Sequence, residues 1–144
     1  MTVDEKIAML RKLFHAFGST GDVTHLLEQL TDDAVYKVSI GPGTPLSGEF
    51  VGKEGIAGYF RDMHTGVEHL ALNVHDFFAN EHKAVVLGDE TLRTTVGGVV
   101  FFTEWATVFT FRGDLISHVL VIENLGALSQ ALGVPHASPP AATA

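Results

Sequence analysis

The spacing of hydrophobic residues changes from a helical period to a strand period near residue 68. Before this point, apolar residues recur every three or four positions, as in helices that bury one face; after it, they alternate with polar residues, as in strands. This pattern predicts three helices and one short strand in the first half of the chain. In the second half it predicts four consecutive strands, whose short connections make them antiparallel neighbours.

The first predicted helix begins in a capping box formed by Thr2 and Glu5 and ends near Gly18. A second, shorter helix follows a turn at residues 19–22 and is closed by residues 31–33. A third begins at residues 52–55, after a Gly- and Pro-rich loop at 41–48 that forms either the lip of a pocket or a plain surface connection. The residues expected to face the core are Ile7, Leu10, Phe14 and Phe17; Leu26, Leu27 and Leu30; and Ile56, Phe60 and Met63.

The predicted strands lie at 35–40, 68–79, 83–95, 99–112 and 115–124. The last two flank a tight turn at Arg112-Gly113-Asp114 and are rich in β-branched and aromatic residues, as in a β-hairpin. Regular alternation then defines three faces of interest: Trp105, Thr107, Phe109 and Phe111; Val119, Val121 and Glu123; and Leu70, Leu72, Val74, Asp76 and Phe78.

Segregated helices followed by strands predict an α+β fold in the order α-α-β-α-β-β-β-β. We expect a curved, cone-shaped sheet with the helices on its concave side, enclosing an apolar pocket. Residues 1–132 would form this single domain, and the Pro- and Ala-rich residues 133–144 a flexible tail. The outer face of the sheet also carries apolar residues, which predicts a homodimer through the convex face. These are Ala106, Val108, Leu120 and Ile122.

Composition narrows the classes of function. The 144 residues include no cysteine, which excludes disulfides, a thiol nucleophile and thiolate metal ligands. A formal net charge of −8 argues against nucleic acid as a partner, because phosphate binding needs clustered Lys and Arg. There is no signal peptide and no apolar run of about 20 residues, so we expect a cytoplasmic protein without a membrane partner. Eight histidines occur without metal-ligand spacing, so no metal site is expected.

Three groups of motifs resemble the nuclear transport factor 2 and ketosteroid isomerase superfamily, and within it the SnoaL-like group. They are Gly21-Asp22 with residues 30–35, Gly52-Lys53-Glu54-Gly55-Ile56, and residues 105–116. The resemblance covers about residues 5 to 132. It implies a cone-shaped barrel with an apolar pocket, which is usually dimeric and free of cofactors. The superfamily includes isomerases, dehydratases, polyketide cyclases and epoxide hydrolases.

The catalytic residues of two known members of the superfamily are replaced here. By alignment, the general base, the oxyanion tyrosine and the protonated aspartate of the steroid isomerases fall on Val38, Phe14 and near Thr107. None of these side chains performs that chemistry, which needs a carboxylate base and hydrogen-bond donors. The triad of the epoxide hydrolases falls on Glu90, Leu92 and Asn124, and is absent as well.

Three acids remain as candidate catalytic residues: Glu123, Glu90 and Asp76. Glu123 ends the last strand, and apolar neighbours would raise its pKa if it pointed inward; otherwise it is a solvated strand end. Regular alternation turns one of Asp89 and Glu90 inward, and the alignment with the superfamily favours Glu90; a bulge at Gly88 would reverse that choice. Asp76 shares an apolar face by alternation, where it would need a partner.

These residues support three hypotheses. The first is a cofactor-independent acid–base enzyme of the isomerase, cyclase or dehydratase type, acting on a small hydrophobic substrate that is carbonyl-bearing or polycyclic. The second is a binding module that holds a lipid-like or aromatic ligand without turnover. The third is a structural dimer with a residual pocket. The residues predicted to line the pocket are Tyr36, Val38, Phe14, Trp105, Thr107, Phe109, Val121, Asn124 and His64.

Overall fold

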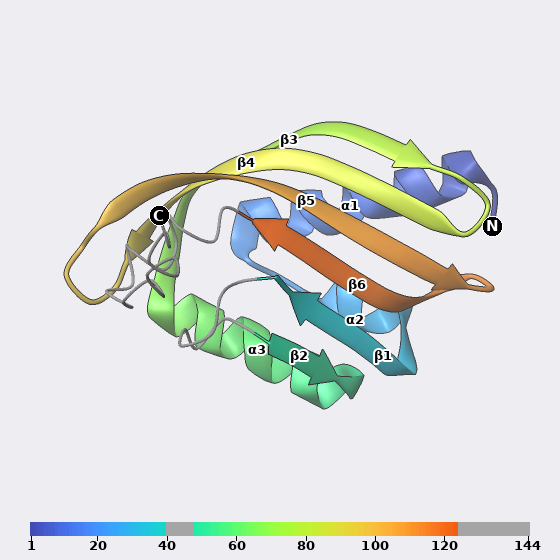
Figure 1. Cartoon of the computed structure of the whole chain (residues 1–144), viewed down its shortest axis with the longest axis horizontal. Coiled ribbons are helices and arrows are strands. Elements are labelled where there is room, and N and C mark those ends of the chain that lie inside the picture. The colour runs from blue at the N-terminus through green and yellow to red at the C-terminus, as the bar shows by residue number, and fades with distance from the viewer. Residues whose placement is uncertain (40–47, 124–144) are drawn as a thin grey trace, which may run out of the picture.

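The computed structural model describes residues 1–39 and 48–123 (Figure 1). Its helices pack on one side of a long, bent sheet. In chain order the elements are α1 (Val3–Thr20), α2 (Thr24–Gln29), β1 (Leu30–Val38), β2 (Gly48–Val51), α3 (Gly52–Gly66), β3 (Val67–Ala79), β4 (Lys83–Thr94), β5 (Val100–Arg112) and β6 (Leu115–Glu123).

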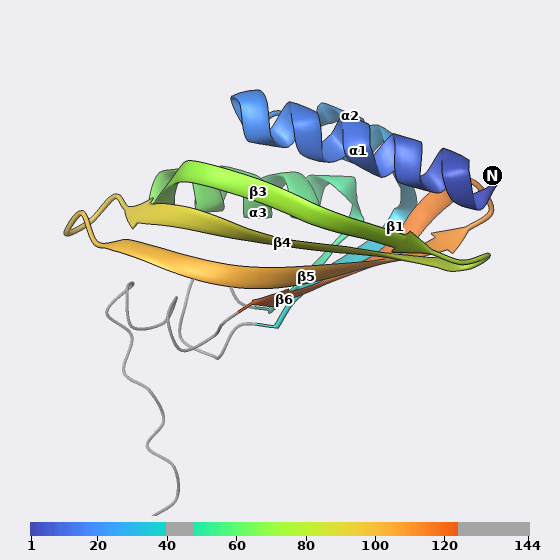
Figure 2. The same ribbon diagram turned by 90° about the horizontal axis from the view of Figure 1, so that it is seen from above.

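The six strands form one sheet in the order β2-β1-β6-β5-β4-β3. Neighbouring strands are antiparallel except β1 and β6, which run parallel. Figure 2 shows all three helices on the same side of the sheet, facing its concave surface. The predicted α+β fold, with helices covering a curved and mainly antiparallel sheet, is therefore confirmed.

The predicted helices exist, but two of their ends were misplaced. The capping box of Thr2 and Glu5 is present, yet α1 continues past Gly18 to Thr20. Gly21 ends it in the left-handed conformation, at φ 71°, and its N–H donates to the carbonyl of Phe17. A glycine reaches this conformation without the steric cost of a side chain. The helix α2 stops at Gln29, so Leu30 and residues 31–33 belong to β1 and do not close the helix.

The strands of the second half match the predicted ranges to within one residue at each end. The strand predicted at 35–40 is longer and begins earlier, at Leu30. The four-residue strand β2 was not predicted; it pairs with β1 and leads directly into α3. Residue 40 and most of the loop predicted at 41–48 lie outside the described residues.

The core lies between the helices and the concave face. In β5 the buried residues are Thr103, Trp105, Thr107, Phe109 and Phe111, as regular alternation predicts. Lys6, which is only 2% exposed, links helix α1 to the turn between β3 and β4. Its ammonium donates to the carbonyls of Asn80 at 3.0 Å and Glu81 in the β3–β4 turn. A buried charge is tolerated here because carbonyl oxygens replace its water shell.

The prediction that Leu70, Asp76 and Phe78 share a face with Leu72 and Val74 is wrong. The pairing of β3 with β4 shifts register between His69 and Ala71, and again between Val74 and Asp76. Each shift adds a residue that regular alternation does not count, so the following side chains change faces. Leu70, Asp76 and Phe78 are exposed, whereas Leu72, Val74, Phe77 and Ala79 pack against the core.

The outer face of the sheet presents apolar side chains, among them Phe102 at 55% exposure and Ile122 at 45%. Such a surface agrees with the expected homodimer, which stays a prediction. Within the described residues, no helix has the length and apolar character needed to cross a membrane.

Candidate functional site

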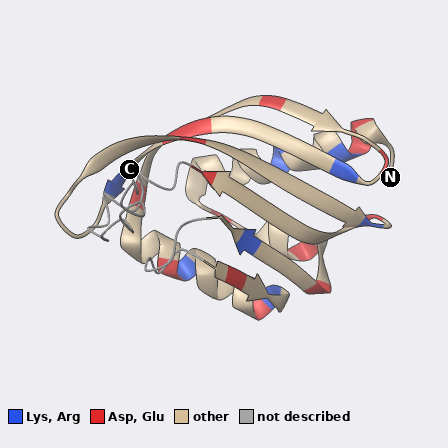
Figure 3. Ribbon diagram, viewed as in Figure 1, with Lys and Arg blue, Asp and Glu red and all other residues tan. Residues whose placement is uncertain are grey.

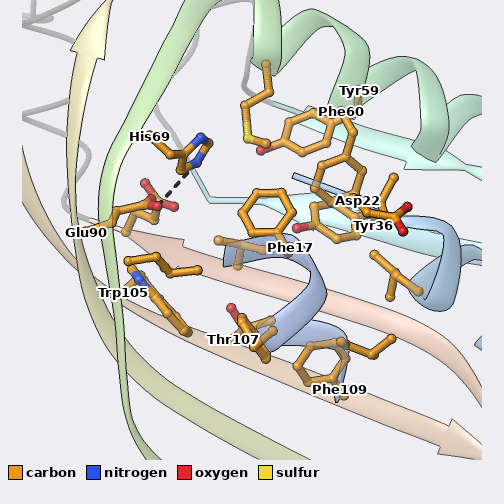
Figure 4. Close-up of a pocket in the computed structure, with 18 residues that line it drawn as sticks. Phe17, Asp22, Tyr36, Tyr59, Phe60, His69, Glu90, Trp105, Thr107 and Phe109 are labelled. Carbon is orange, nitrogen blue, oxygen red and sulfur yellow. Dashed lines mark ion pairs between the residues drawn. The ribbon is translucent and has the colours of Figure 1, made fainter. Parts of the chain in front are cut away.

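A cavity of about 100 Å³ lies between the helices and the concave face of the sheet (Figure 4). Its walls are mainly aromatic and aliphatic. Asp22 is exposed yet lines the cavity, which places an opening at the turn between α1 and α2. Few polar groups lie farther inside the cavity. In an apolar pocket, a small number of polar groups fixes the orientation of a ligand.

The structure brings most of the predicted site residues to this one cavity. Val38 is buried in the core without lining it, His64 is exposed at the end of α3, and Asp76 is exposed on β3. Asn124 lies outside the described residues. The predicted residues that line the cavity are Phe14, Tyr36, Glu90, Trp105, Thr107, Phe109, Val121 and Glu123.

Glu90 points into the cavity because β4 alternates regularly there. The pairing of β4 with β5 shows no register shift, so Gly88 forms no bulge and Asp89 faces the opposite side. Glu90 is only 6% exposed. Its Oε2 lies 3.4 Å from His69 Nε2, and Figure 4 shows the two side chains facing each other. On the outer side, Asp89 accepts hydrogen bonds from Asn73 at 2.9 Å and pairs with His75.

Glu123 is the second acid in the cavity. It lies opposite Trp105 in the β5–β6 pairing, whereas Glu90 lies opposite Thr103, two residues earlier on the same face of β5. Burial raises the pKa of Glu123 well above its ordinary value, and the negative charge of Glu90 and a hydrogen bond with Glu90 raise it further. Two carboxyl groups this close cannot both ionise easily, so the pair retains a proton on Glu123.

Trp105 forms one wall of the cavity and lies flat against its neighbours. Its ring stacks on Phe14, with centroids 5.3 Å apart and planes 9° apart. Gly88 lies opposite Trp105 in the β4–β5 pairing, and a side chain there would overlap the indole, so only glycine leaves the ring this space. The indole Nε1 is buried, and no group among the described residues accepts its hydrogen. Within the described residues, this donor at the cavity wall is open to an acceptor on a bound ligand.

Tyr36 and Tyr59 close the cavity on the side of β1 and α3, with ring centroids 5.2 Å apart. Burial raises the pKa of both phenols, and the charges of Glu123 and Glu90 act in the same direction. Both hydroxyls therefore stay protonated at neutral pH and can donate hydrogen bonds.

Three polar residues of the site were not predicted from the sequence: His69, Tyr59 and Asp22. Tyr59 was open to prediction, because it lies three residues after Ile56 on the buried face of α3. His69 was not, because the register shift after it places it on the cavity side together with Leu72. In the described part of the chain, no three His, Asp or Glu side chains are grouped to hold a metal ion.

A family model for the SnoaL-like domain matches residues 10–119. No curated protein sequence matches the chain. A solved NTF2-like protein from Burkholderia xenovorans LB400 is 22% identical, with a TM-score of 0.79 over 92% of this chain and 98% of its own.

Two further solved structures share the fold. TerC, co-crystallised with polyporic acid, is 19% identical, with a TM-score of 0.75 over 88% of this chain and 97% of its own. A protein from Rhodopseudomonas palustris, described as a candidate isomerase, is 13% identical, with a TM-score of 0.72 over 88% and 96%. At these identities the likeness is one of fold.

Proposed function

Because the chain belongs to the SnoaL-like domain family, we propose that it catalyses cofactor-free acid–base chemistry on a small hydrophobic compound that carries a carbonyl group. The observation that supports this most directly is the carboxyl pair of Glu90 and Glu123 inside an apolar cavity, with His69 in contact with Glu90. General acid–base catalysis needs one group that gives a proton and another that takes one. A pair that holds a single proton supplies both.

The roles follow from the protonation of the pair. Glu123 donates its proton to the carbonyl oxygen of the ligand, while Glu90 removes a proton from the carbon next to that carbonyl. The C–H electron pair becomes the C=C bond of an enol, so no redox partner is needed. Return of the proton to a different carbon would complete an isomerisation. His69 contacts Glu90, and its side chain is 20% exposed against 8% for Glu90, so His69 links Glu90 to solvent.

The size of the cavity limits the reacting part of the ligand. An engineered cavity of about 150 Å³ accepts benzene, and the volume here is about 100 Å³. A carbonyl group with a few attached carbon atoms fits this cavity without any change in the protein, whereas a six-membered ring requires small shifts of the lining side chains. A polycyclic compound would have to extend out of the cavity.

Exchange of hydrogen for deuterium tests this chemistry without knowledge of the natural substrate. Butanone and cyclohexanone would be incubated with the protein in D₂O, and loss of the α-proton signals followed by NMR. The wild type should accelerate exchange above buffer, and Glu90→Gln should abolish the acceleration. Glu104→Gln is the matched control, because Glu104 is an exposed carboxylate on the opposite face of β5. Equal exchange in wild type and Glu90→Gln would refute the proposal.

A binding module is the second candidate, favoured by the predominance of apolar groups in the cavity walls. In that case ketones would bind and raise the melting temperature, but exchange would remain at the rate of buffer. The same set of samples therefore distinguishes the two functions.

A further inference from the structure

A second hollow, of about 650 Å³, lies on the outside of the cavity, between α1 and the edge strand β3. Its floor is apolar and includes Leu72 and Phe77 of β3. Its rim on α1 is basic, formed by Arg11, Lys12 and His15, which are all exposed. We call this hollow the outer groove.

The basic rim is unusual in this chain, which has 17 acidic residues against 9 Lys and Arg. Among the described residues, Lys37, Arg93 and Arg112 pair with carboxylates, and Lys6 is held by carbonyls. Arg11 and Lys12 take part in none of the ion pairs in the described part of the chain, as is also true of Lys53, Arg61 and Lys83. What distinguishes Arg11 and Lys12 is that they lie together at the rim of an apolar hollow. Figure 3 shows the basic stretch of α1 beyond its acidic first turn.

Arg11 is held in place by an aromatic ring and not by an acid. Its guanidinium lies 4.4 Å from the centroid of the Phe77 ring, over the floor of the outer groove. A cation–π contact of this kind fixes the position of the group but leaves its hydrogen-bond donors free for an anion. Lys12 adds a second positive charge at the same rim.

The outer groove and the cavity share two side chains, Phe14 and Leu72. Phe14 is only partly buried, and its other face stacks on Trp105 inside the cavity. A ligand seated in the outer groove therefore rests against the side chain that separates it from the carboxyl pair.

We propose that the outer groove binds the carboxylate end of an amphipathic ligand, with the carboxylate on Arg11 and Lys12 and the apolar part on Leu72 and Phe77. The inference extends the proposed function by naming the class of ligand, an aliphatic or aryl carboxylate. It rests on the proposed function only for the reaction of such a ligand in the cavity, and not for its binding in the outer groove. Charge complementarity selects an anion, and the apolar floor selects a ligand with a hydrophobic body in place of a bare ion.

Calorimetric titration with octanoate and octan-1-ol tests the groove, because the two ligands share a chain length and differ in charge. Octanoate should bind more tightly than octan-1-ol, and less tightly as salt is added. The double variant Arg11→Gln/Lys12→Gln should weaken octanoate about tenfold while leaving octan-1-ol unchanged, as expected for two exposed charge contacts. The control is Lys53→Gln/Arg61→Gln, which removes the same charge from exposed positions on α3.

Fluorescence of Trp105, the sole tryptophan, reports the link with the cavity, because Phe14 stacks on it. Octanoate should change its emission in the wild type and in the control, and much less in the groove variant.

Equal affinity for octanoate and octan-1-ol, or equal loss of affinity in both double variants, would overturn the inference. Tighter binding of inorganic phosphate than of octanoate would also overturn it, because the apolar floor would then contribute nothing. Failure of the exchange assay leaves these results untouched, so the groove and the acid–base chemistry are tested separately.

Discussion

Substitution of Gly88 by alanine should destabilise the fold strongly, although a single methyl group is added. A Cβ at this position would lie 2.8 Å from Cε2 of Trp105, and closer still to Cζ2 of the same ring and to the backbone oxygen of Asn73. Ordinary contacts of a Cβ begin at about 3.4 Å, so the methyl group overlaps two neighbours by more than half an ångström.

Neither neighbour of Gly88 can move easily. The indole of Trp105 is stacked on Phe14, and the oxygen of Asn73 belongs to the backbone of β3. Overpacking usually costs about 1–3 kcal/mol, and two rigid neighbours place this case near 3 kcal/mol. With a urea m-value of about 2 kcal/mol per molar, the unfolding midpoint should fall by about 1.5 M.

Urea unfolding followed by far-ultraviolet circular dichroism measures this shift, because it does not depend on the displaced tryptophan. Gly66→Ala is the matched control: no heavy atom lies within 4 Å of its added Cβ, and its φ is outside the left-handed region. The control should differ from the wild type by less than about 1 kcal/mol. Coincident midpoints for Gly88→Ala and Gly66→Ala would refute the packing argument for Trp105.

Two further predictions concern buried charge. Because the folded pKa of Glu123 exceeds its ordinary value of 4.5, the native state keeps a proton that the unfolded chain releases as the pH rises above that value. Wild-type stability should therefore fall as the pH rises above 4.5, by up to about 1.4 kcal/mol per unit, and the stability gained by Glu123→Gln in urea titrations should grow over the same range; a pH-independent difference would contradict this. Lys6→Met should lower the free energy of unfolding by about 1–3 kcal/mol in the same assay, because two carbonyl oxygens of the β3–β4 turn lose their donor, and an unchanged midpoint would contradict the role given to that contact.

The sequence alone was enough to predict features that follow regular periods. Alternation in β5 and β6 correctly places Trp105 and Val121 on the buried side, and the family alignment correctly selects Glu90 over Asp89 as the inward acid of β4. The capping box of Thr2 likewise identifies the start of α1. Local rules succeed at these positions because the β4–β5 pairing has no register shift and the shift in the β5–β6 pairing lies between Thr110 and Phe111, away from Trp105 and Val121.

The remaining features depend on contacts between distant segments. Two register shifts in β3 reverse the faces of the strand, so Asp76 is exposed and His69 reaches Glu90. No residue type in β3 marks where such shifts occur. The approach of Glu90 to Glu123 depends on both strands flanking β5, and the pocket-lining Tyr36 depends on β1 pairing with β6.

The parallel pairing of β1 with β6 has a consequence for how the protein is made. The two strands are more than 80 positions apart, since Val35 pairs with His118 and Val38 with Val121. Closing so long a loop costs entropy that only the finished contact repays, which slows folding. During translation, β1 and β2 must wait for nearly the whole domain to leave the ribosome before they gain their place in the sheet. Glu123 lies in β6 as well, so a partly made chain has neither a closed wall nor the second carboxyl group of the cavity.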